Sequence, residues 1–501
     1  MLDTFLQLTA GPQTFSAQPA TRWDLPGRAF WAGDWQQSDN SQLVCDPDSG
    51  APLAVVADTT GDEMRRAVDA AARERDQGDA WPAWQRRRAL HQASRILTER
   101  AELFASTIAA EGIKTIREAR LEVARAAHTL LLSSEQAGSL TGHTLPFDSS
   151  PRGAGRLGWY SREPIGLVAA LTPYNDPLNL VAHKLGPALV AGNVVVLKPA
   201  EATPIVALRL AEVLLEAGVP PGRISILPGG PEAGRALVTH DEVDLVSFTG
   251  GWRTGDAVAR AAGAKKTMME LGGCSAVVVL ADSDVNTAAR AVAQGAFGSA
   301  GQNCISVQRV FVDAEVFGPF VSCLAEHAEA LVVGPKDDPQ TDIGPLISER
   351  EARRIEGWIA EAAAGGAQIL TGMRRMGSFL WPTVLTGVPS DASLMTQEVF
   401  GPVVCVESVA TVADAVRRVN ENQYGLHAGV YTRTIDTALM IATQLRVGAV
   451  MINDTSDFRI DEMPFGGFKH SGVGREGVRN AVEAMTEPKV IALRLPISEQ
   501  R

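Results

Sequence analysis

The sequence predicts an α/β protein in which helices cover both faces of a parallel sheet. Short runs of Val, Ile, Leu and Ala alternate with helical segments between residues 165 and 271, and a second alternation of the same kind follows. Such alternation is typical of parallel sheets that are buried on both faces. The chain has 501 residues, 45% of them apolar, so it can bury a large core and is expected to form about three domains.

The first alternation is the most regular part of the chain. The expected strands are Gly166–Leu171, Val194–Leu197, Ile224–Leu227, Val243–Phe248 and Lys266–Leu271. The expected helices are Pro177–Val190, Pro204–Ala217, Ala233–Thr239 and Thr254–Ala262. Gly218 ends the second of these helices. Sheets of this kind bind ligands at the carboxyl ends of their strands, so the turns after the strands are the candidate site.

The segments before this unit are expected to be mostly helical. Residues 1–40 contain scattered Pro, Gly and Gln and are expected to be irregular. From about residue 62 the apolar residues recur with helical spacing, and two long helices are expected over Trp84–Leu103 and Ile108–Leu132. Residues 133–164 are polar and rich in Gly and Pro, which predicts a break or an extended hairpin arm.

The second alternation begins after the last strand of the first. Strands are expected over Ala276–Leu280, Gln308–Val312 and Lys489–Leu495. Helices are expected over Val285–Phe297, Ala314–Val332 and Glu349–Ala364.

The composition argues against several classes of protein. The chain has 46 Lys and Arg against 58 Asp and Glu, a formal charge of −12, and no basic run, which argues against nucleic-acid binding. Its five cysteines form no C-x-x-C pair, so no metal site is expected and a reducing compartment fits. The N-terminus lacks the charged start of a secretory signal, and no apolar run approaches the roughly 18 residues of a membrane helix. We therefore expect a cytoplasmic protein without a nucleic-acid or membrane partner.

Two turns carry groups suited to covalent catalysis. Gly298–Cys304 surrounds one thiol with small residues, as an accessible nucleophile requires, and its backbone N–H groups can stabilise an oxyanion. Glu270 ends a strand and precedes two glycines, where it is placed to act as a general base. Taken singly, each signal is weak, because a lone Cys is more often core filler and a Glu at such a place more often caps a loop.

Three further turns carry candidate binding groups. Asn175, in Thr172–Pro177, offers an amide to an oxyanion, although Asn and Pro are also ordinary turn residues. Lys198 and Glu201 follow a buried strand and suit the hydroxyls of a ribose, although a surface ion pair would explain them equally. Phe248–Gly255 allows a pyrophosphate to approach a helix N-terminus, although the G-x-G-x-x-G fingerprint is absent.

These five turns occur together and in order, and as a set they resemble the motifs of the aldehyde dehydrogenase superfamily. The resemblance runs from about Trp31 to Pro488 and includes the later segments Glu398–Pro402 and Pro464–Gly472. It implies that Cys304 is the nucleophile, Glu270 the base that activates the hydrolytic water and Asn175 the oxyanion donor. The implied reaction is attack of Cys304 on an aldehyde, transfer of hydride to the nicotinamide of NAD(P) to leave a thioester, and hydrolysis to a carboxylate.

The resemblance also implies further site residues. Lys184 matches a lysine of the proton path. The residues that match cofactor contacts are Lys198 and Glu201 at the adenosine ribose, Gly250 and Gly255 at the pyrophosphate turn with Thr249 and Leu271 beside them, and Glu398 and Phe400 at the nicotinamide ribose and ring. Glu201 would repel a 2′-phosphate, which favours NAD and leaves NADP open.

The architecture implied by the resemblance has three parts: a Rossmann-like cofactor domain, an α/β catalytic domain and a small β oligomerisation arm. The NAD(P)-binding domain is expected over residues 20–141 and 165–274, and the catalytic domain over residues 275–477. The arm is expected over residues 142–164 and 478–501. Exchange of such an arm between subunits implies a homodimer or homotetramer.

Three residues depart from the family pattern. Gly251 replaces the usual Ser or Thr, so one contact to the pyrophosphate is lost, and the bulky Trp252 beside it is unexpected. Cys274 follows the Glu-Leu-Gly-Gly segment, where it is either a second redox-active thiol or a small packed residue. None of these changes removes a catalytic group.

The expected substrate face is polar. Asp176, Asn179, Leu180 and His183 share one helical face, which the resemblance places along the substrate tunnel. Arg459 stands where members with apolar substrates have an aromatic residue, and Asn303 flanks the nucleophile. These substrate residues, Asp176, Asn179, His183, Asn303 and Arg459, suggest a small polar aldehyde, and an anionic one if Arg459 and His183 bind an anion. A direct Arg459–Asp176 pair that only shapes the pocket is the alternative.

Three other functions remain open at this point. A CoA-acylating aldehyde dehydrogenase would pass the thioester to CoA and would not need Glu270. A non-redox thiol acyltransferase or hydrolase would not need the nucleotide-binding turns. A non-catalytic protein of the same fold would be expected to have lost Cys304 or Glu270, and neither is lost.

Overall fold

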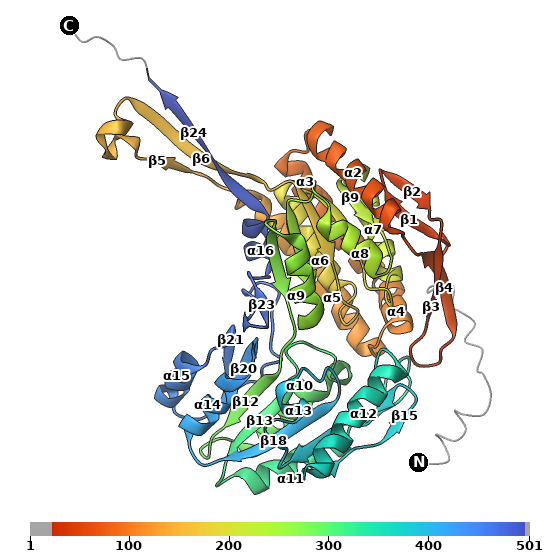
Figure 1. Ribbon diagram of the computed structural model, residues 1–501, viewed down its shortest axis with the longest axis vertical. Coiled ribbons are helices and arrows are strands. Elements are labelled where there is room, and N and C mark those ends of the chain that lie inside the picture. The colour runs from red at the N-terminus through yellow and green to blue at the C-terminus, as the bar shows by residue number, and fades with distance from the viewer. Residues whose placement is uncertain (1–22, 496–501) are drawn as a thin grey trace.

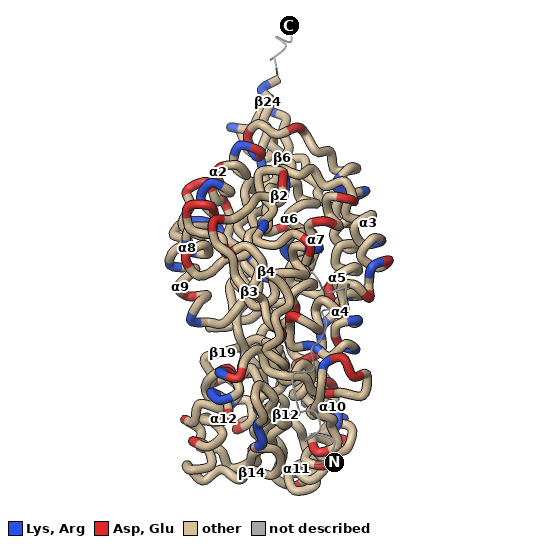
Figure 2. The backbone as a smooth tube through the Cα atoms, turned by 90° about the vertical axis from the view of Figure 1, so that its right-hand side faces the viewer, with Lys and Arg blue, Asp and Glu red and all other residues tan. Residues whose placement is uncertain are grey.

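A computed structural model of the chain describes residues 23–495, which form two α/β units and a protruding arm (Figure 1). The expectations for residues 1–22 and for the end of the segment 478–501 lie outside the described residues. Acidic and basic residues are interspersed on the face that Figure 2 shows. Within residues 23–495, no helix combines the length and apolar character that a membrane crossing requires.

The first unit contains an eight-stranded sheet in the order β2-β1-β9-β8-β7-β10-β11-β23. Its five central strands, β9 to β11 in this order, are parallel, as expected. The strands are β1 (Arg28–Trp31), β2 (Asp34–Gln37), β7 (Leu167–Leu171), β8 (Val194–Lys198), β9 (Ile224–Ile226), β10 (Leu245–Thr249), β11 (Lys266–Glu270) and β23 (Gly472–Val473).

Helices cover both faces of this sheet. Alternate residues of a strand point to opposite faces, so Val168 and Ala170 of β7 join one core while Leu167 and Ala169 join the other. The first core is completed by α3 (Ala83–Glu99), α4 (Ala101–Glu111), α5 (Ile116–Glu135), α6 (Asn179–Ala191), α7 (Ile205–Glu216) and α16 (Val478–Ala484). The second is completed by α2 (Gly61–Gln77), α8 (Pro231–Thr239) and α9 (Trp252–Ala262).

The two long helices expected before this unit are wrong in their boundaries. The helix expected over Trp84–Leu103 is interrupted at Arg100, which separates α3 from α4. The helix expected over Ile108–Leu132 is interrupted at Gly112, whose backbone is extended. A capping box of Thr115 and Glu118 then begins α5. Local capping therefore outweighs a continuous apolar period.

The N-terminal segment is also more regular than expected. Residues 28–37 form a hairpin of β1 and β2 that extends the first sheet. Ala32 and Gly33 connect the strands, both with positive φ (52° and 83°), as a tight two-residue hairpin turn requires. A second hairpin joins β3 (Ser41–Cys45) and β4 (Pro52–Ala57).

The second unit contains a seven-stranded sheet in the order β14-β17-β18-β13-β12-β20-β21, parallel except at β14. The strands are β12 (Ser275–Val279), β13 (Val307–Asp313), β14 (Gln368–Thr371), β17 (Thr383–Thr386), β18 (Val403–Val409), β20 (His427–Tyr431) and β21 (Ala449–Ile452). The helices are α10 (Val285–Phe297), α11 (Phe317–Glu329), α12 (Glu349–Ala364), α13 (Ser393–Thr396), α14 (Val412–Glu421) and α15 (Ile435–Gln444). Shorter pairs are β15 (Arg375–Met376) with β16 (Phe379–Leu380), and β19 (Tyr424–Gly425) with β22 (Phe468–Lys469).

The arm is a three-stranded antiparallel sheet that extends away from both units (Figure 1). It consists of β5 (His143–Leu145), β6 (Arg156–Pro164) and β24 (Thr486–Arg494). The segment 142–164 and the C-terminal strand, which were expected to form one arm, therefore pair with each other. Val490, Ile491 and Leu493 of β24 are exposed.

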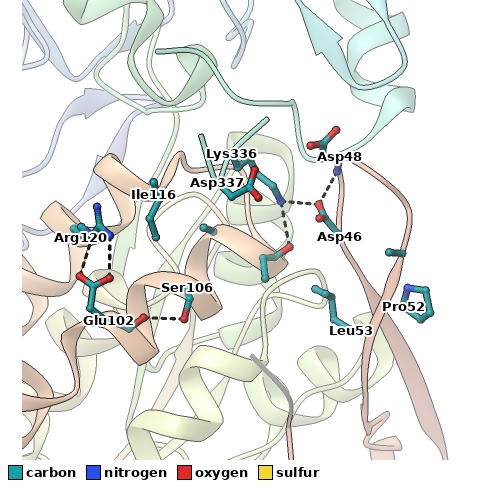
Figure 3. A pocket seen from close by; sticks show the side chains of 13 residues that line it. Asp46, Asp48, Pro52, Leu53, Glu102, Ser106, Ile116, Arg120, Lys336 and Asp337 are labelled. Atoms are coloured by element: carbon teal, nitrogen blue, oxygen red, sulfur yellow. Dashed lines mark hydrogen bonds and ion pairs between the residues drawn. The ribbon is translucent and has the colours of Figure 1, made fainter. Parts of the chain in front are cut away.

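A buried lysine ties the second unit to the first. Lys336 Nζ donates to Asp46 Oδ1 at 2.6 Å and to the Ala110 carbonyl at 3.2 Å (Figure 3). It also donates to the Gly112 carbonyl at 3.0 Å. Ala110 and Gly112 lie at the C-terminal end of α4, where carbonyl groups lack helical partners and attract a cation. The lysine therefore satisfies this helix end from the other unit.

A buried carboxyl group, that of Glu111, accepts hydrogen bonds from the N-terminal end of α7. The two side-chain oxygens of Glu111 accept the backbone N–H groups of Ile205 (2.7 Å) and Val206 (2.8 Å), which begin that helix. Glu111 is 1% exposed, so no water can replace these contacts. The helix start thus depends on a residue from α4, far away in the sequence.

We predict that Glu111→Ala lowers the free energy of unfolding by about 2–4 kcal/mol, because two buried N–H groups lose their acceptor. Glu102→Ala is the matched control on the same helix, since Glu102 pairs with Arg120 at the surface and such pairs contribute about 0–1 kcal/mol (Figure 3). Urea unfolding followed by circular dichroism would measure both. Equal effects of the two substitutions would contradict this account of α7.

Candidate functional site

A cavity of about 440 Å³ lies where the carboxyl ends of β7, β10 and β11 face the loops of the second unit. Twelve of the residues singled out from the sequence line it: Asn175, Asp176, Leu180, Thr249, Gly250, Gly251, Glu270, Leu271, Asn303, Cys304, Glu398 and Phe400. Arg459 lines it as well. The structure therefore brings together groups that are more than two hundred residues apart in the chain.

Cys304 follows an unusual loop. After α10, the turn η5 (Gly298–Gly301) contains Ser299 and Ala300 with left-handed φ of 51° and 53°, and Glu118 Oε1 accepts the Ser299 N–H at 2.7 Å. The loop is so close to the first unit that a Cβ at Gly273 would lie 2.3 Å from the Cys304 carbonyl oxygen. Close approach of the two units thus explains the second glycine after Glu270.

The thiol of Cys304 lies beside an apolar cluster of Ile305, Leu426 and Phe465. Burial raises the pKa of this thiol, and the positive charge of Arg459 opposes the rise. The thiol donates to Asn303 Oδ1 over 3.8 Å. The resting form of Cys304 is therefore the protonated thiol, and the positive charge of Arg459 is the one that could stabilise the thiolate.

Glu270 is placed as a base at the end of β11. Its Oε1 accepts the backbone N–H of Glu476 at 3.2 Å, whereas its Oε2 is buried and has no hydrogen-bond partner among residues 23–495. Burial, and then the nearby charge of Glu476, raise its pKa well above the ordinary value. A carboxylate with one free oxygen and a raised pKa suits removal of a proton from water.

The other two predicted catalytic residues differ in their exposure to the cavity. Asn175, in the loop after β7, lines the cavity, and its amide makes no hydrogen bond to another described residue, so it is free to donate to an oxyanion. Lys184 lies behind the cavity, where its Nζ donates to Ser247 Oγ at 3.0 Å. Burial lowers the pKa of Lys184, while the charges of Glu476 and Glu270 oppose this shift.

The polar face of α6 is largely turned away from the cavity. Asn179 and His183 are each 1% exposed and do not line it. Both contact Asp461 Oδ1, His183 Nε2 at 2.9 Å and Asn179 Nδ2 at 3.3 Å. The expectation that these two residues touch the substrate is thus not supported, because Asp461 satisfies them. In the sequence, Asp461 stands two positions after Arg459, and this carboxylate was the available sign that Asn179 and His183 have a partner within the protein.

Asp176 and Arg459 do not form the direct pair considered above. Asp176 Oδ1 binds Lys114, which also holds Glu122 Oε2 at 2.9 Å, and Arg125 Nη1 lies 4.0 Å from Asp176. Arg459 Nη2 instead pairs with Glu476 at 2.9 Å. Lys114 and Arg125 lower the pKa of Asp176 against the effect of burial.

Three guanidinium groups line the cavity, those of Arg125, Arg354 and Arg459. Arg354 binds Glu351 Oε2 at 2.7 Å and the Val399 carbonyl at 2.8 Å. Arg125, which sequence analysis missed, binds Asp461 through Nη2 at 2.9 Å. Arg459 lies over the ring of Phe465, 3.9 Å from its centroid, and its Nε has no hydrogen-bond partner among the described residues. Helical spacing in the sequence could have placed Arg125 on α5. It could not have shown that Arg125 contacts the loop of Asp461, which lies more than three hundred residues later.

The predicted pyrophosphate turn has the shape of an anion site. Gly251 precedes α9 without a side-chain cap, so the first N–H groups of this helix remain free. Thr249 Oγ1 is buried without a partner and lines the cavity. Gly255 lies within α9, where a Cβ would be 2.3 Å from Leu271. The turn therefore has free donors and room for a phosphate group.

The predicted ribose contacts fall into two groups. Glu398 and Phe400 line the cavity, and Glu398 Oε1 accepts the Gly273 N–H at 3.2 Å. Burial raises the pKa of Glu398 to about 7. Lys198 and Glu201 lie outside the cavity at the end of β8, where Lys198 Nζ donates to the Gly229 carbonyl at 2.5 Å and Glu201 is exposed. The structure therefore places Lys198 and Glu201 apart from the cavity that Glu398 and Phe400 line.

The departures from the family pattern are accommodated locally. The ring of Trp252 stacks on His470, with centroids 3.8 Å apart and planes 7° from parallel. Cys274 is buried and its thiol donates to the Met395 carbonyl over 3.7 Å, so it is a packed residue in this structure. A Cβ at Gly251 would meet nothing within 4 Å, so nothing in the packing requires a glycine there.

Comparisons with known proteins agree with this geometry. Residues 35–491 match the sequence profile of the aldehyde dehydrogenase family. The chain is 43% identical to a 3-sulfolactaldehyde dehydrogenase of Priestia megaterium over 464 residues, 92% of this chain and 97% of that protein. Aldehyde dehydrogenase 21 of Physcomitrella patens, solved with the product succinate, has a TM-score of 0.90 and 34% identity over 94% of this chain and 98% of its own.

An NADP complex of glyceraldehyde-3-phosphate dehydrogenase from Bacillus halodurans has a TM-score of 0.91 and 34% identity over 94% of this chain and 99% of its own. The family profile, the close relatives and the shared fold agree along nearly the whole chain. The chain therefore belongs to the aldehyde dehydrogenase family, and it is an NAD(P)-dependent enzyme that oxidises an aldehyde to a carboxylate.

Proposed function

We propose that this enzyme oxidises a small aldehyde that carries an anionic group, through a thioester on Cys304 that is hydrolysed by water activated by Glu270. The observation that carries the proposal is the presence of Arg125 and Arg459 in the same cavity as the thiol and the base. An aldehyde held at Cys304 by its carbonyl carbon would then direct its charged end toward the two guanidinium groups.

The catalytic steps follow from the positions of four groups. Cys304 attacks the carbonyl carbon, while the Asn175 amide and the Cys304 backbone N–H stabilise the oxyanion. A bound NAD(P) would supply the acceptor for the hydride that leaves the tetrahedral adduct on Cys304. Glu270 then removes a proton from water through its free Oε2, and this water releases the acid from Cys304. Lys184, whose charge acts on Glu270, is our candidate to pass that proton onward.

Both arginines retain donors for a substrate. Arg125 uses Nη2 and Nε on Asp461, and its Nη1 is 4.0 Å from Asp176, beyond hydrogen-bonding distance. Arg459 uses Nη2 on Glu476 and His183, so Nη1 is not engaged by another described side chain. Lys114 meanwhile neutralises Asp176, the carboxylate that would otherwise repel an anion. These contacts favour an anionic substrate over a cationic one.

The relatives support the same substrate class. The name of the 3-sulfolactaldehyde dehydrogenase specifies an aldehyde with a sulfonate, and that of the glyceraldehyde-3-phosphate dehydrogenase an aldehyde with a phosphate. The product bound to aldehyde dehydrogenase 21 is a dicarboxylate. We infer that this chain shares the preference for an anionic end, without assigning one particular anion.

The fate of the thioester and the choice of cofactor follow from two carboxylates. Glu270 has a free oxygen in the cavity, which supports hydrolysis rather than transfer to CoA. Glu201 is exposed at the end of β8, where it would accept hydrogen bonds from a free ribose 2′-OH and repel a 2′-phosphate. We therefore propose NAD as the preferred cofactor and leave NADP as the alternative.

The division of the chain and its assembly complete the proposal. We assign residues 20–141 and 165–274 to NAD(P) binding, 275–477 to catalysis, and residues 142–164 with β24 (Thr486–Arg494) to the arm. The start of the expected segment 478–501 is different, because α16 (Val478–Ala484) packs in the core of the first unit. The exposed apolar residues of β24 support exchange of the arm between the subunits of a homodimer or homotetramer. The cysteines are free thiols, which suits a cytoplasmic setting.

The decisive experiment measures reduced-cofactor formation by the purified protein with NAD or NADP. The aldehydes should be of similar size and either neutral, hydroxylated, aminated, carboxylated, sulfonated or phosphorylated. We expect the highest kcat/KM for an anionic member with NAD, and no turnover by Cys304→Ala. Faster oxidation of the neutral aldehydes, or a strict requirement for CoA, would contradict the proposal.

We predict that Arg459→Leu and Arg125→Leu each lower kcat/KM for an anionic aldehyde by about 10- to 100-fold, the effect of losing a charge-assisted hydrogen bond. A neutral aldehyde of the same length serves as the control in each variant. Its kcat/KM should fall less, because it reports only the cost of leaving Glu476 or Asp461 without its arginine partner. Arg459→Lys, which keeps the charge and loses the planar fork, should give an intermediate value. An unchanged kcat/KM for the anionic aldehyde in Arg459→Leu would exclude anion binding there.

We predict a pH limb that depends on Glu476. Glu270 must be ionised to act as a base, so kcat should fall as the pH falls through its raised pKa. Glu476→Gln removes a like charge, which lowers the pKa of Glu270 and moves this limb to lower pH. Glu270→Gln should abolish the limb together with most of the steady-state rate. A pH profile of kcat measures all three, and a limb that stays in place in Glu476→Gln would contradict the assignment.

A further inference from the structure

A chain of side-chain contacts leads from Asp457 to the nucleophile. Asn303 Nδ2 donates to Asp457 Oδ1, and Asn303 Oδ1 accepts the thiol of Cys304 over 3.8 Å. The same oxygen accepts the backbone N–H of Ile305 at 3.4 Å. Because an amide has a donor end and an acceptor end, the partner on one side decides which end faces the other side.

The contacts on both sides of Asn303 agree on its orientation. An ionised Asp457 can only accept, so it requires the NH₂ group, while the Ile305 N–H can only donate and requires the oxygen. Ser456 Oγ donates to the Ile305 carbonyl at 2.8 Å, which fixes the Asp457 segment against the nucleophile loop. Gly295 of α10 leaves room for this packing, since a Cβ there would lie 3.2 Å from Asp457 Cβ.

This orientation favours the thiol over the thiolate. A carbonyl oxygen accepts an S–H hydrogen bond but presents its negative end to a sulfur anion. The opposite orientation of Asn303 would present NH₂ to the sulfur and stabilise the thiolate. Asp457 is therefore able to influence Cys304 without touching it.

We propose that Asp457 is a positioning residue that binds the Asn303 amide, turns its oxygen toward Cys304 Sγ and keeps the nucleophile protonated in the resting enzyme. The inference rests on the proposed role of Cys304 as nucleophile. Its consequence is a thiol that reacts slowly with general electrophiles before an aldehyde occupies the cavity.

The ionisation of Asp457 sets the conditions for a test. Burial and the charges of Asp176 and Asp454 raise its pKa to about 7, while Arg125 and the hydrogen bond from Asn303 oppose this rise. At a pH of about 8 the carboxylate is mostly ionised, so the orientation of Asn303 is set. Below this range the carboxyl group can donate as well as accept, so its constraint on the amide is weaker and the orientation depends on the Ile305 N–H.

The test measures the rate at which iodoacetamide alkylates Cys304 at a pH of about 8, where Asp457 is mostly ionised. Mass spectrometry of the peptide that contains Cys304 follows the reaction. Neither aldehyde nor cofactor is present, so the result is independent of the proposed substrate. Asp457→Ala and Asn303→Leu should each accelerate alkylation about tenfold, the effect of one lost hydrogen bond on the thiol pKa. Thermal melting of each variant checks that the fold is retained.

Two further variants separate this contact from a general charge effect. Asp457→Asn removes the charge but keeps an oxygen that can accept from Asn303 Nδ2, so it should alkylate at nearly the wild-type rate. The double variant Asp457→Ala with Asn303→Leu should match Asn303→Leu alone, because Asp457 acts through Asn303. A fast Asp457→Asn variant, additive effects in the double variant, or no acceleration in Asp457→Ala would each overturn the proposal.

Discussion

The contact between Glu476 and Glu270 holds the site together. The backbone N–H of Glu476 donates to Glu270 Oε1, and its carboxylate pairs with Arg459, so one residue positions both the base and a guanidinium group. Glu476 is itself fixed by two backbone hydrogen bonds with Phe465, of 2.7 and 2.9 Å. Phe465 in turn supports Arg459 and packs beside Cys304. The geometry of the base, the thiol and the arginine therefore depends on one bridged loop.

Such a site is stable only if every buried charge has a partner. Lys114 pairs with both Glu122 and Asp176, Arg125 lies 4.0 Å from Asp176, and Asp461 binds His183 and Arg125. Removing one member would leave an uncompensated charge, which is far more costly than the pair is stabilising. The Glu122 contacts to the first N–H groups of α6 show that the same network also positions secondary structure. Catalytic placement and folding thus share one set of contacts.

The sequence predicted the features that depend on local pattern or on the order of motifs along the chain. The parallel strands, and the convergence of Cys304, Glu270 and Asn175 on one cavity, are of this kind. It did not predict the partners of polar residues, because those come from distant segments. Asn179 and His183 have the polarity of substrate ligands, yet Asp461 satisfies both. For the same reason Glu476 and Arg125 escaped notice, since no local feature distinguishes them from surface charges.

If the substrate is anionic, as we propose, the pairing of Arg125 and Arg459 with carboxylates explains how the cavity is stable before the substrate binds. An unpaired guanidinium group in a buried cavity would carry a large desolvation cost. Arg125 and Arg459 avoid this cost by each binding a carboxylate through part of the guanidinium group, Asp461 and Glu476 respectively. The remaining N–H groups stay available, and their attraction is weakened by the neighbouring carboxylates. Under the proposed function, recognition of the anion then depends on the geometry of these free donors, because the neighbouring carboxylates offset the positive charge of the arginines.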